Sequence, residues 1–178
     1  MTEEKKEEAK AEPKVLSGNF AVVTNDGKEI TTTFELFRQS KVVSDFYSVA
    51  PVTDKMPVAT ISAETFEKIV AFYKNYENKA IPKVDKPLKT NKVEEIFKDE
   101  WLRGFLNLAV APLFDILAAC DFLGMEDLKQ LAACAIAAKL WGKTFEELRA
   151  EYKITSELTE DNDKALKRFF AWADQLWP

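Results

Sequence analysis

The segment Gly142–Arg149, which reads GKTFEELR, decides how the C-terminal third of this chain folds. Thr144 is followed three residues later by Glu147, which is the spacing of a capping box. In that motif a hydroxyl and a carboxylate each accept a hydrogen bond from a free backbone N–H at the start of a helix. Gly142 stands where a preceding helix, ending near Leu140–Trp141, needs a left-handed closing residue. The segment therefore predicts a sharp helix–turn–helix corner with a tryptophan beside it.

Helical patterns continue on both sides of this corner. Before it, apolar periodicity predicts helices at Ala111–Leu123 and Asp127–Leu140, and an earlier helix that Asn91 caps. After it, Thr159 followed by two acids predicts the start of a last helix. The aromatic residues of that helix divide into two groups. We expect Phe169 and Phe170 to close the chain's own core, and Trp172 and Trp177 to form a surface that anchors a partner protein.

The N-terminal half predicts a small mixed unit. Residues 20–34 contain two β-branched runs around an Asp-Gly turn, which is a strong signal for a β-hairpin. Apolar spacing then favours a short helix from Phe34 and a second helix after Ser40. We expect a brief strand at Val58–Ile61 and a helix capped by Ser62. Hairpin, helices, strand and helix together indicate an α+β unit.

Two segments have the composition of exposed, unpacked chain. Residues 2–14 consist almost entirely of charged residues and alanine, so they cannot bury enough surface to offset the entropy of ordering. Residues 80–90 contain two prolines and three lysines, which is typical of a linker. We therefore expect a disordered tail at the N-terminus and a linker between the α+β unit and the helical half.

Composition excludes several kinds of chemistry. The 178 residues include no histidine, which removes Ser-His-Asp and Cys-His catalysis and most zinc sites. Cys120 and Cys134 both lie in apolar helical context, so we expect reduced, buried thiols rather than metal ligands or a disulfide. The paired acids Glu94–Glu95 and Glu146–Glu147 are better interpreted as solvated helix faces than as acid–base pairs. We expect no enzyme activity, no metal and no cofactor.

Charge and hydropathy exclude two classes of partner, nucleic acid and membrane. A net charge of -5 and a pI near 5.0 argue against nucleic acid, because a polyanion would be repelled over most of the surface. The sequence lacks an apolar run long enough to span a membrane and lacks the core of a signal peptide. We expect a protein of the cytoplasm and nucleus whose partners are other proteins.

An ordered set of blocks resembles the Skp family of adaptor subunits of SCF ubiquitin ligases. The resemblance covers Phe20 to Trp172, with gaps. Its blocks are the Asp26–Gly27 hairpin followed by Arg38-Gln39-Ser40, the run Leu113–Ala119 (LFDILAA), Gly142–Arg149, the helix start at Thr159-Glu160, and Trp172. The GKT-x-EE-[IL]-R block is fairly specific when it follows an alanine-rich helix, as it does here.

This resemblance implies a fold, a domain organisation and a function. The fold is a BTB/POZ-type α+β domain with an appended C-terminal helical region that binds F-box proteins. The implied organisation is a disordered tail at 1–17, the α+β domain at 18–84, a linker with the remaining BTB helices at 85–124, and the F-box-binding helices at 125–178. Members of the family join an F-box substrate receptor to a cullin scaffold and perform no chemistry themselves.

The resemblance also assigns residues to the two partner surfaces. The implied F-box-binding residues are Ile136, Leu140, Trp141, Lys143, Leu148 and Trp172. The implied cullin-binding residues are Asp121 and Phe122, at positions where the family typically has Asn and Tyr. The two differences remove hydrogen-bonding groups from this surface, and the first adds a charge that is costly if it is buried unpaired.

Other departures from the family pattern indicate a divergent paralogue and leave two functions open. The loop between Val49 and Val58 is short, and the segment between Leu102 and Leu113 is longer and markedly apolar. One function is an SCF adaptor with both partners. The alternative is a Skp-like interaction protein that works without a cullin. It would self-associate as a homodimer through the apolar run Phe105–Val110, a run that equally suits the core.

Overall fold

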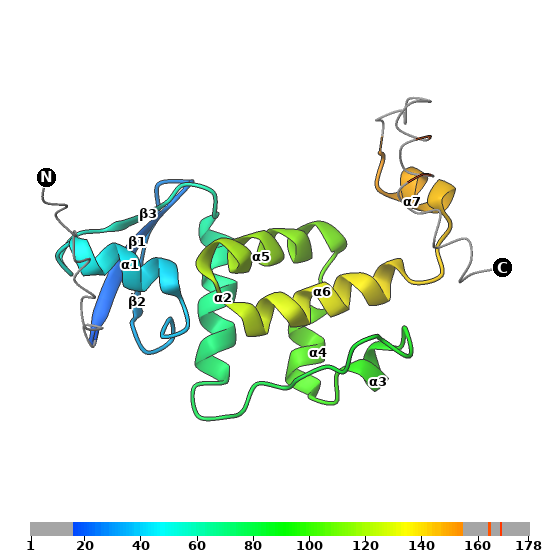
Figure 1. Cartoon of the computed structure of the whole chain (residues 1–178), viewed down its shortest axis with the longest axis horizontal. Helices are drawn as coiled ribbons and strands as arrows, with labels where there is room; N and C mark the ends of the chain where they lie inside the picture. Colours follow the sequence, from blue (N-terminus) through cyan, green and yellow to red (C-terminus); the bar gives the residue numbers. More distant parts are fainter. Residues whose placement is uncertain (1–15, 155–163, 165–167, 169–178) are drawn as a thin grey trace, which may run out of the picture. The chain divides into compact units, whose positions relative to one another are not determined.

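The computed structural model describes residues 16–154, Lys164 and Arg168 (Figure 1). The chain divides into two compact units, residues 1–139 and residues 140–178, and each is described here by itself. The described residues form three strands and seven helices, which confirms a mixed α+β chain. Residues 1–15 of the predicted tail and the start of the predicted helix at Thr159 lie outside the described residues, as do Phe169, Phe170, Trp172 and Trp177.

A three-stranded sheet forms the N-terminal end of the first unit. Strands β1 (Asn19–Thr24) and β2 (Glu29–Thr33) pair antiparallel around the Asp-Gly turn, so the predicted hairpin is confirmed. Strand β3 (Met56–Val58) pairs parallel to the other edge of β1, giving the order β2-β1-β3. The strand expected at Val58–Ile61 was therefore placed too late, because the chain turns directly after Val58 and the Ile61 N–H bonds back to its carbonyl.

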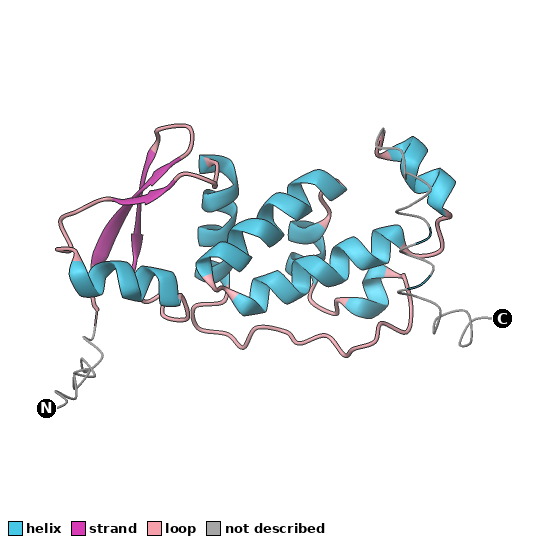
Figure 2. Cartoon of the chain, turned by 45° about the horizontal axis from the view of Figure 1, so that its top comes forward, coloured by secondary structure: helices cyan, strands magenta, loops and turns pink. Residues whose placement is uncertain are grey.

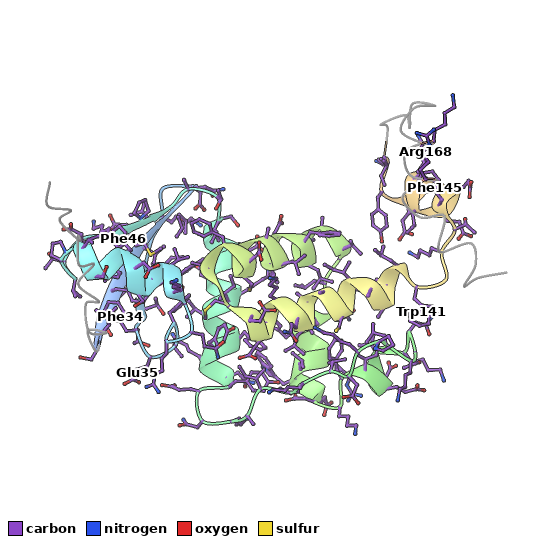
Figure 3. The ribbon with its side chains drawn as sticks, in the orientation of Figure 1. Phe34, Glu35, Phe46, Trp141, Phe145 and Arg168 are labelled. Carbon is purple, nitrogen blue, oxygen red and sulfur yellow. The ribbon has the colours of Figure 1, made fainter. Side chains whose placement is uncertain are left out.

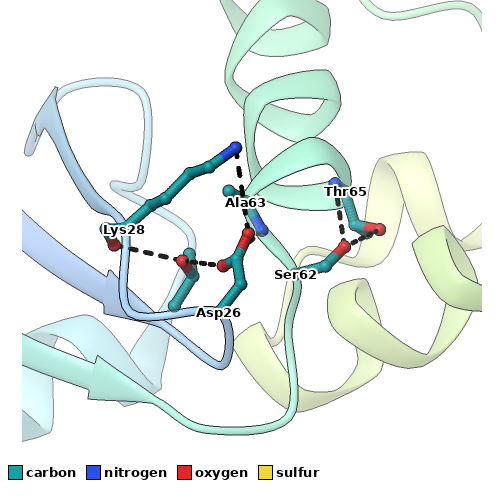
Figure 4. Close-up of polar contacts among 6 residues, drawn as sticks. Asp26, Lys28, Ser62, Ala63 and Thr65 are labelled. Atoms are coloured by element: carbon teal, nitrogen blue, oxygen red, sulfur yellow. Dashed lines mark hydrogen bonds and ion pairs between the residues drawn. The ribbon is translucent and has the colours of Figure 1, made fainter.

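Polar contacts fasten the hairpin turn to the helix that follows the sheet, α2 (Ala63–Asn75) (Figure 4). The Asp26 carboxylate accepts a hydrogen bond from the Thr24 hydroxyl and one of 3.2 Å from the N–H of Ala63. The Thr24 bond is the main reason why the pKa of Asp26 lies below its ordinary value. Ser62 caps α2 as predicted, its hydroxyl accepting from the N–H of Thr65 at 3.3 Å.

The segment before helix α1 (Lys41–Val49) differs from its prediction. The expected helix from Phe34 is a series of turns, in which Phe37 and Ser40 donate to carbonyls three residues back. Its apolar side chains belong to an aromatic core, where the rings of Phe34 and Phe20 are 4.7 Å apart, and this packing takes precedence over helical continuation. Helix α1 itself begins after Ser40 as predicted.

The helix expected after Asn91 is divided in two. Helix α3 (Val93–Ile96) begins after Lys92 without a side-chain cap, so the predicted cap at Asn91 is wrong. Helix α4 (Glu100–Leu106) begins separately, because the Asp99 carboxylate accepts the N–H of Leu102 at 3.2 Å. The same carboxylate accepts the Tyr76 hydroxyl at 2.7 Å, so a contact from α2 fixes where α4 starts.

The last two helices of the first unit follow their predictions closely. Helix α5 (Val110–Leu123) packs against α2 and α1 and ends at Gly124, which has a left-handed φ of 69°. Helix α6 (Glu126–Leu140) buries three of its five alanines, Ala132, Ala135 and Ala138. None of the described helices is by itself long and apolar enough to cross a membrane; α4 and α5 reach that length and composition only as a pair bent by 103°.

Candidate functional site

The corner that opens the second unit has the predicted backbone geometry. Gly142 has a φ of 75°, in the left-handed region where a residue with a Cβ is strained. The N–H of Lys143 bonds back to the carbonyl oxygen of Leu140 at 3.3 Å, which closes the turn after α6. Gly142 therefore has the role that the sequence predicts for it.

The capping box at the start of α7 (Phe145–Glu151) is confirmed. The Thr144 hydroxyl accepts a hydrogen bond of 3.3 Å from the N–H of Glu147, and the Glu147 carboxylate accepts one of 2.8 Å from the N–H of Thr144. Each residue thus satisfies a backbone donor that the helix start leaves free. These two reciprocal bonds therefore fix the residue at which α7 begins.

Lys143 and Arg149 are held against α7 by their neighbours. Lys143 forms an ion pair with Glu151 and lies 5.8 Å from the ring centroid of Tyr152. The bond to Glu151 is the main cause that raises the pKa of Lys143, so this side chain stays charged. The Arg149 guanidinium lies 5.7 Å from the ring centroid of Phe145. The corner therefore combines oriented cations with aromatic rings.

Apolar side chains of the second unit are strongly exposed. Trp141 is 47% exposed, Phe145 is 53% exposed and Ile154 is 46% exposed, while Leu148 is half-buried. Trp141 follows α6 directly and Phe145 is the first residue of α7 (Figure 3). Exposed aromatic residues near a fixed turn are typical anchors of protein interfaces. We call Trp141, Lys143, Phe145, Leu148 and Ile154 the corner surface.

The other residues predicted to bind an F-box differ in their surroundings. Ile136 is buried on α6 at 6% exposure, and Leu140 is half-buried at the end of that helix. Trp172 lies outside the described residues. Phe145 and Ile154 were not among the predicted site residues; the sequence marked Phe145 only as part of an apolar stripe, and Ile154 carried no signal.

The predicted cullin-binding pair lies at the C-terminal end of α5. The Asp121 carboxylate forms a salt bridge of 2.7 Å with Lys129 of α6. That hydrogen bond is the main cause that raises the pKa of Lys129, which also pairs with Glu126 at 3.4 Å. Phe122 is 43% exposed beside this ion pair. The charge that replaces the family's amide is thus on the surface and already has a partner.

A further exposed stripe extends this pair along α5. Phe114, which is 48% exposed, Ala118 and Phe122 recur at intervals of four residues and lie on the exposed side of the helix. Leu113, Ile116 and Cys120 occupy the buried side. The sequence predicted this helix, but Phe114 was not among the predicted surface residues. The four-residue spacing of Phe114, Ala118 and Phe122 was the signal that could have revealed it.

The described residues offer little for acid–base or metal chemistry. In residues 16–154, Lys164 and Arg168, no group of three His, Cys, Asp or Glu side chains could hold a metal ion. Cys120 and Cys134 are free and buried, as predicted, and burial raises the pKa of the Cys120 thiol to about 12. Glu94, Glu95, Glu146 and Glu147 are exposed, in agreement with solvated helix faces.

Known proteins are similar to this chain both in the corner segment and over most of its length. Residues 126–173 match the family model described as "Skp1 family, dimerisation domain". A S-phase kinase-associated protein 1 homolog of Tetrahymena thermophila is 23% identical over 142 residues, covering 79% of this chain and 85% of that protein. SKP1-like protein 12 of Arabidopsis thaliana is 23% identical over 152 residues, covering 85% of this chain and 94% of the relative.

A fungal relative extends the match to a protein whose name states its complex. The E3 ubiquitin ligase complex SCF subunit sconC of Aspergillus terreus is 21% identical over 160 residues, covering 89% of this chain and 98% of that subunit. The matches are low in identity but span most of both chains, and the family model covers α6, the corner and α7. The chain is therefore a divergent relative of the Skp1 family.

Proposed function

We propose that this chain is a non-enzymatic adaptor of an SCF-type E3 ubiquitin ligase, which joins an F-box protein to a cullin scaffold. The observation that carries the proposal is the coincidence of two features in one segment. Residues 126–173 match the Skp1 family model, and the same segment contains the capped corner with its exposed Trp141 and Phe145. A relative aligned over most of its length is named as an SCF subunit, which supports the same role.

The F-box protein binds the corner surface in this proposal. Trp141 and Phe145 supply exposed aromatic area, which is the kind of surface that dominates binding energy at protein interfaces. Lys143, fixed by Glu151, adds a charge of set position. Leu140 and Leu148 contribute half-buried apolar area. We also assign Trp172 and Ile136 to F-box binding, on the family resemblance alone.

The cullin binds the first unit, which we assign to the BTB/POZ type. The exposed stripe Phe114, Ala118 and Phe122 offers apolar contacts along two turns of α5. Asp121 extends it with a carboxylate already paired with Lys129, so binding there need not leave an unpaired buried charge. The partner surface must accommodate an ion pair and a phenyl ring where the family presents an amide and a phenol.

The adaptor acts by position rather than by chemistry. The sequence has no histidine, and the described acids that sit side by side are exposed on helix faces. The closure at Gly142 and the reciprocal bonds of Thr144 and Glu147 give the receptor a locally well-formed helix start to bind.

Co-expression with an F-box segment, followed by size-exclusion chromatography, tests the proposal. We expect a stable one-to-one complex, and we expect that complex to capture a cullin from a panel of purified cullins. No complex with any F-box segment would overturn the assignment. A complex with the F-box segment but with no cullin would leave the alternative, a Skp-like interaction protein that works without a cullin; light scattering on the free chain would then show whether it forms a homodimer.

A further inference from the structure

The linker between α2 and α3 has a charge opposite to that of the whole chain. Residues 79–92 contain five lysines and one acid, Asp85, although the net charge of the protein is -5. The side chains of Lys79, Lys83, Lys86 and Lys89 are all exposed. We call these four residues the lysine strip. The linker that carries most of them is the long loop between α2 and α3 in Figure 2.

Three of the acids around the lysine strip have other partners. Asp127 accepts a hydrogen bond of 2.8 Å from the Gln39 amide, and Glu95 pairs with Lys92 at 3.1 Å. Glu126 pairs with Lys129 and accepts a bond from Gln130. Within the described part of the chain, none of the ammonium groups of the four strip lysines takes part in a salt bridge or a hydrogen bond. Their ammonium groups remain available to an acidic partner.

Three hollows accompany the strip along its length. The first, of about 630 Å³, is lined by Lys79 and Lys83 together with Arg38 and the buried Tyr73, whose hydroxyl has no hydrogen-bond partner among the described residues. The second, of about 440 Å³, is lined by Lys83 and Lys86. The third, of about 140 Å³, is lined by Lys89. Each hollow thus has at least one strip lysine in its wall.

The linker holds its apolar residues inward and its lysines outward. Ile81, Val84 and Leu88 are half-buried, whereas Lys83, Lys86 and Lys89 are exposed at intervals of three residues. The chain is extended from Lys83 to Val84–Asp85, where three residues would span roughly 10 Å. It bends at residues 86–87, where Lys86-Pro87 is a cis peptide bond, so the three lysines are spread along the loop without even spacing. Charges spread along a loop match carboxylates spaced along a partner segment. The half-buried apolar residues leave no side chain free to insert into a lipid surface.

We propose that the lysine strip binds an extended acidic segment of a partner protein, whose carboxylate side chains enter the hollows beside Lys83, Lys86 and Lys89. A protein segment fits better than a nucleic acid, because Asp85, Asp127 and Glu95 lie in the walls of the same hollows and would repel a continuous row of phosphates. A peptide can place neutral residues opposite these acids. This inference does not depend on the SCF assignment.

Fluorescence anisotropy on the full chain tests the inference with a defined probe. The probe is a labelled twelve-residue peptide with glutamate at every third position and glycine or serine between. At low salt, where surface electrostatics are least screened, we expect saturable binding that weakens as salt is added. The triple variant K83Q/K86Q/K89Q should lower the affinity at least about fivefold.

A matched variant distinguishes the effect of losing the lysine strip from the effect of changing the net charge. K28Q/K41Q/K55Q removes three exposed lysines from the sheet and α1, so it changes the net charge equally and should lower the affinity less than about twofold. Equal losses in the two triple variants would overturn the proposal, as would the absence of peptide binding at low salt. Tighter binding of single-stranded RNA or of anionic vesicles than of the peptide would also overturn it.

Discussion

The Ser40 hydroxyl donates a hydrogen bond of 2.5 Å to the carbonyl oxygen of Leu123 and accepts one of 3.3 Å from the N–H of Val43. Ser40 is 1% exposed, so both bonds are shielded from water. One side chain thus caps α1 and satisfies a carbonyl at the C-terminal end of α5. That end carries Asp121 and Phe122, so the position of the proposed cullin surface depends on this contact.

We expect the variant Ser40→Ala to destabilise the chain by about 1–3 kcal/mol, because it removes a helix cap and leaves a buried carbonyl unsatisfied. Urea denaturation followed by circular dichroism measures the loss. Ser44→Ala is the matched control, because Ser44 is exposed on the same helix, and we expect it to change stability by less than about 0.5 kcal/mol. Equal stability of the two variants would contradict the role given to Ser40.

The corner surface predicts a loss of F-box binding when its aromatic residues are truncated. We expect Trp141→Ala and Trp172→Ala each to weaken the complex by about 1–2 kcal/mol, the effect typical of an aromatic anchor. Calorimetric titration with a purified F-box segment gives the values. Phe122→Ala removes an exposed aromatic ring from α5 and should leave this affinity unchanged. If Phe122→Ala weakened F-box binding as much as the tryptophan variants do, the assignment of the two surfaces would fail.

We expect the affinity for the cullin to rise when the residues typical of the family are restored at positions 121 and 122. The double variant D121N/F122Y removes the salt bridge with Lys129 and adds an amide and a phenol hydroxyl. If the two substitutions in this chain weaken cullin binding, we expect the variant to bind at least about fivefold more tightly, since a hydrogen bond at an interface contributes about 1 kcal/mol. Pull-down against the cullin panel measures it, with Lys129→Gln as the control that removes the ion pairs with Asp121 and Glu126 but adds neither family side chain.

The capping box predicts a local effect on α7. Removing the Thr144 hydroxyl with Thr144→Ala should destabilise the start of the helix by about 1 kcal/mol, whereas Thr144→Ser retains the oxygen and should change little. Hydrogen exchange of the amides in Phe145–Glu151 reports the difference. Faster exchange confined to this helix in the alanine variant is the expected outcome. Unchanged exchange would show that the reciprocal bonds with Glu147 do not hold the corner.

The bond between Tyr76 and Asp99 predicts a pH dependence of stability. Hydrogen bonds, first of all the one from the Tyr76 hydroxyl, hold the pKa of Asp99 below its ordinary value. A carboxyl with a lowered pKa in the folded state contributes stability above its unfolded pKa, and this contribution is lost as the pH falls through the folded pKa. Asp99→Asn keeps a capping side chain but removes the titration.

The melting temperature of the two proteins between pH 7 and pH 3 checks this dependence. The unfolded pKa of an aspartate is about 3.9, so we expect the wild type to be the more stable protein at pH 7 and its advantage over Asp99→Asn to shrink below about pH 4. A constant difference in melting temperature across the range would show that Asp99 does not titrate as proposed.

Features that depend on neighbouring residues were predictable from the sequence. The capping box of Thr144 and Glu147, the caps at Ser40 and Ser62 and the left-handed Gly142 all act over at most four residues, and the structure has each of them. The features that were mispredicted depend on distant contacts. The helix expected after Asn91 is divided because Asp99 starts α4 separately, and a tyrosine of α2 also binds the Asp99 carboxylate.

In the candidate site, too, features set by nearby residues were predictable and features set by distant contacts were not. Trp141 could be identified because it adjoins a recognisable turn, and Asp121 and Phe122 because they occupy a position in a familiar block. The partner of Asp121 could not, since the salt bridge with Lys129 depends on how α5 and α6 meet after Gly124. The bond between Ser40 and Leu123 joins residues 83 positions apart and leaves no local pattern in either segment.

The buried Cys120 allows helix opening to be followed by the rate of thiol labelling. Cys120 is fully buried and its thiol has a pKa of about 12, so at neutral pH almost none of it exists as the reactive thiolate. Cys134 is buried as well, at 6% exposure. A thiol-specific reagent can therefore modify Cys120 only when the helices around it separate, whereas Cys134 lines the second hollow. The labelling rate of Cys120 therefore reports how often these helices separate. A partner that binds α5 or α6 and keeps the helices together would lower this rate, and no engineered probe is needed to measure it.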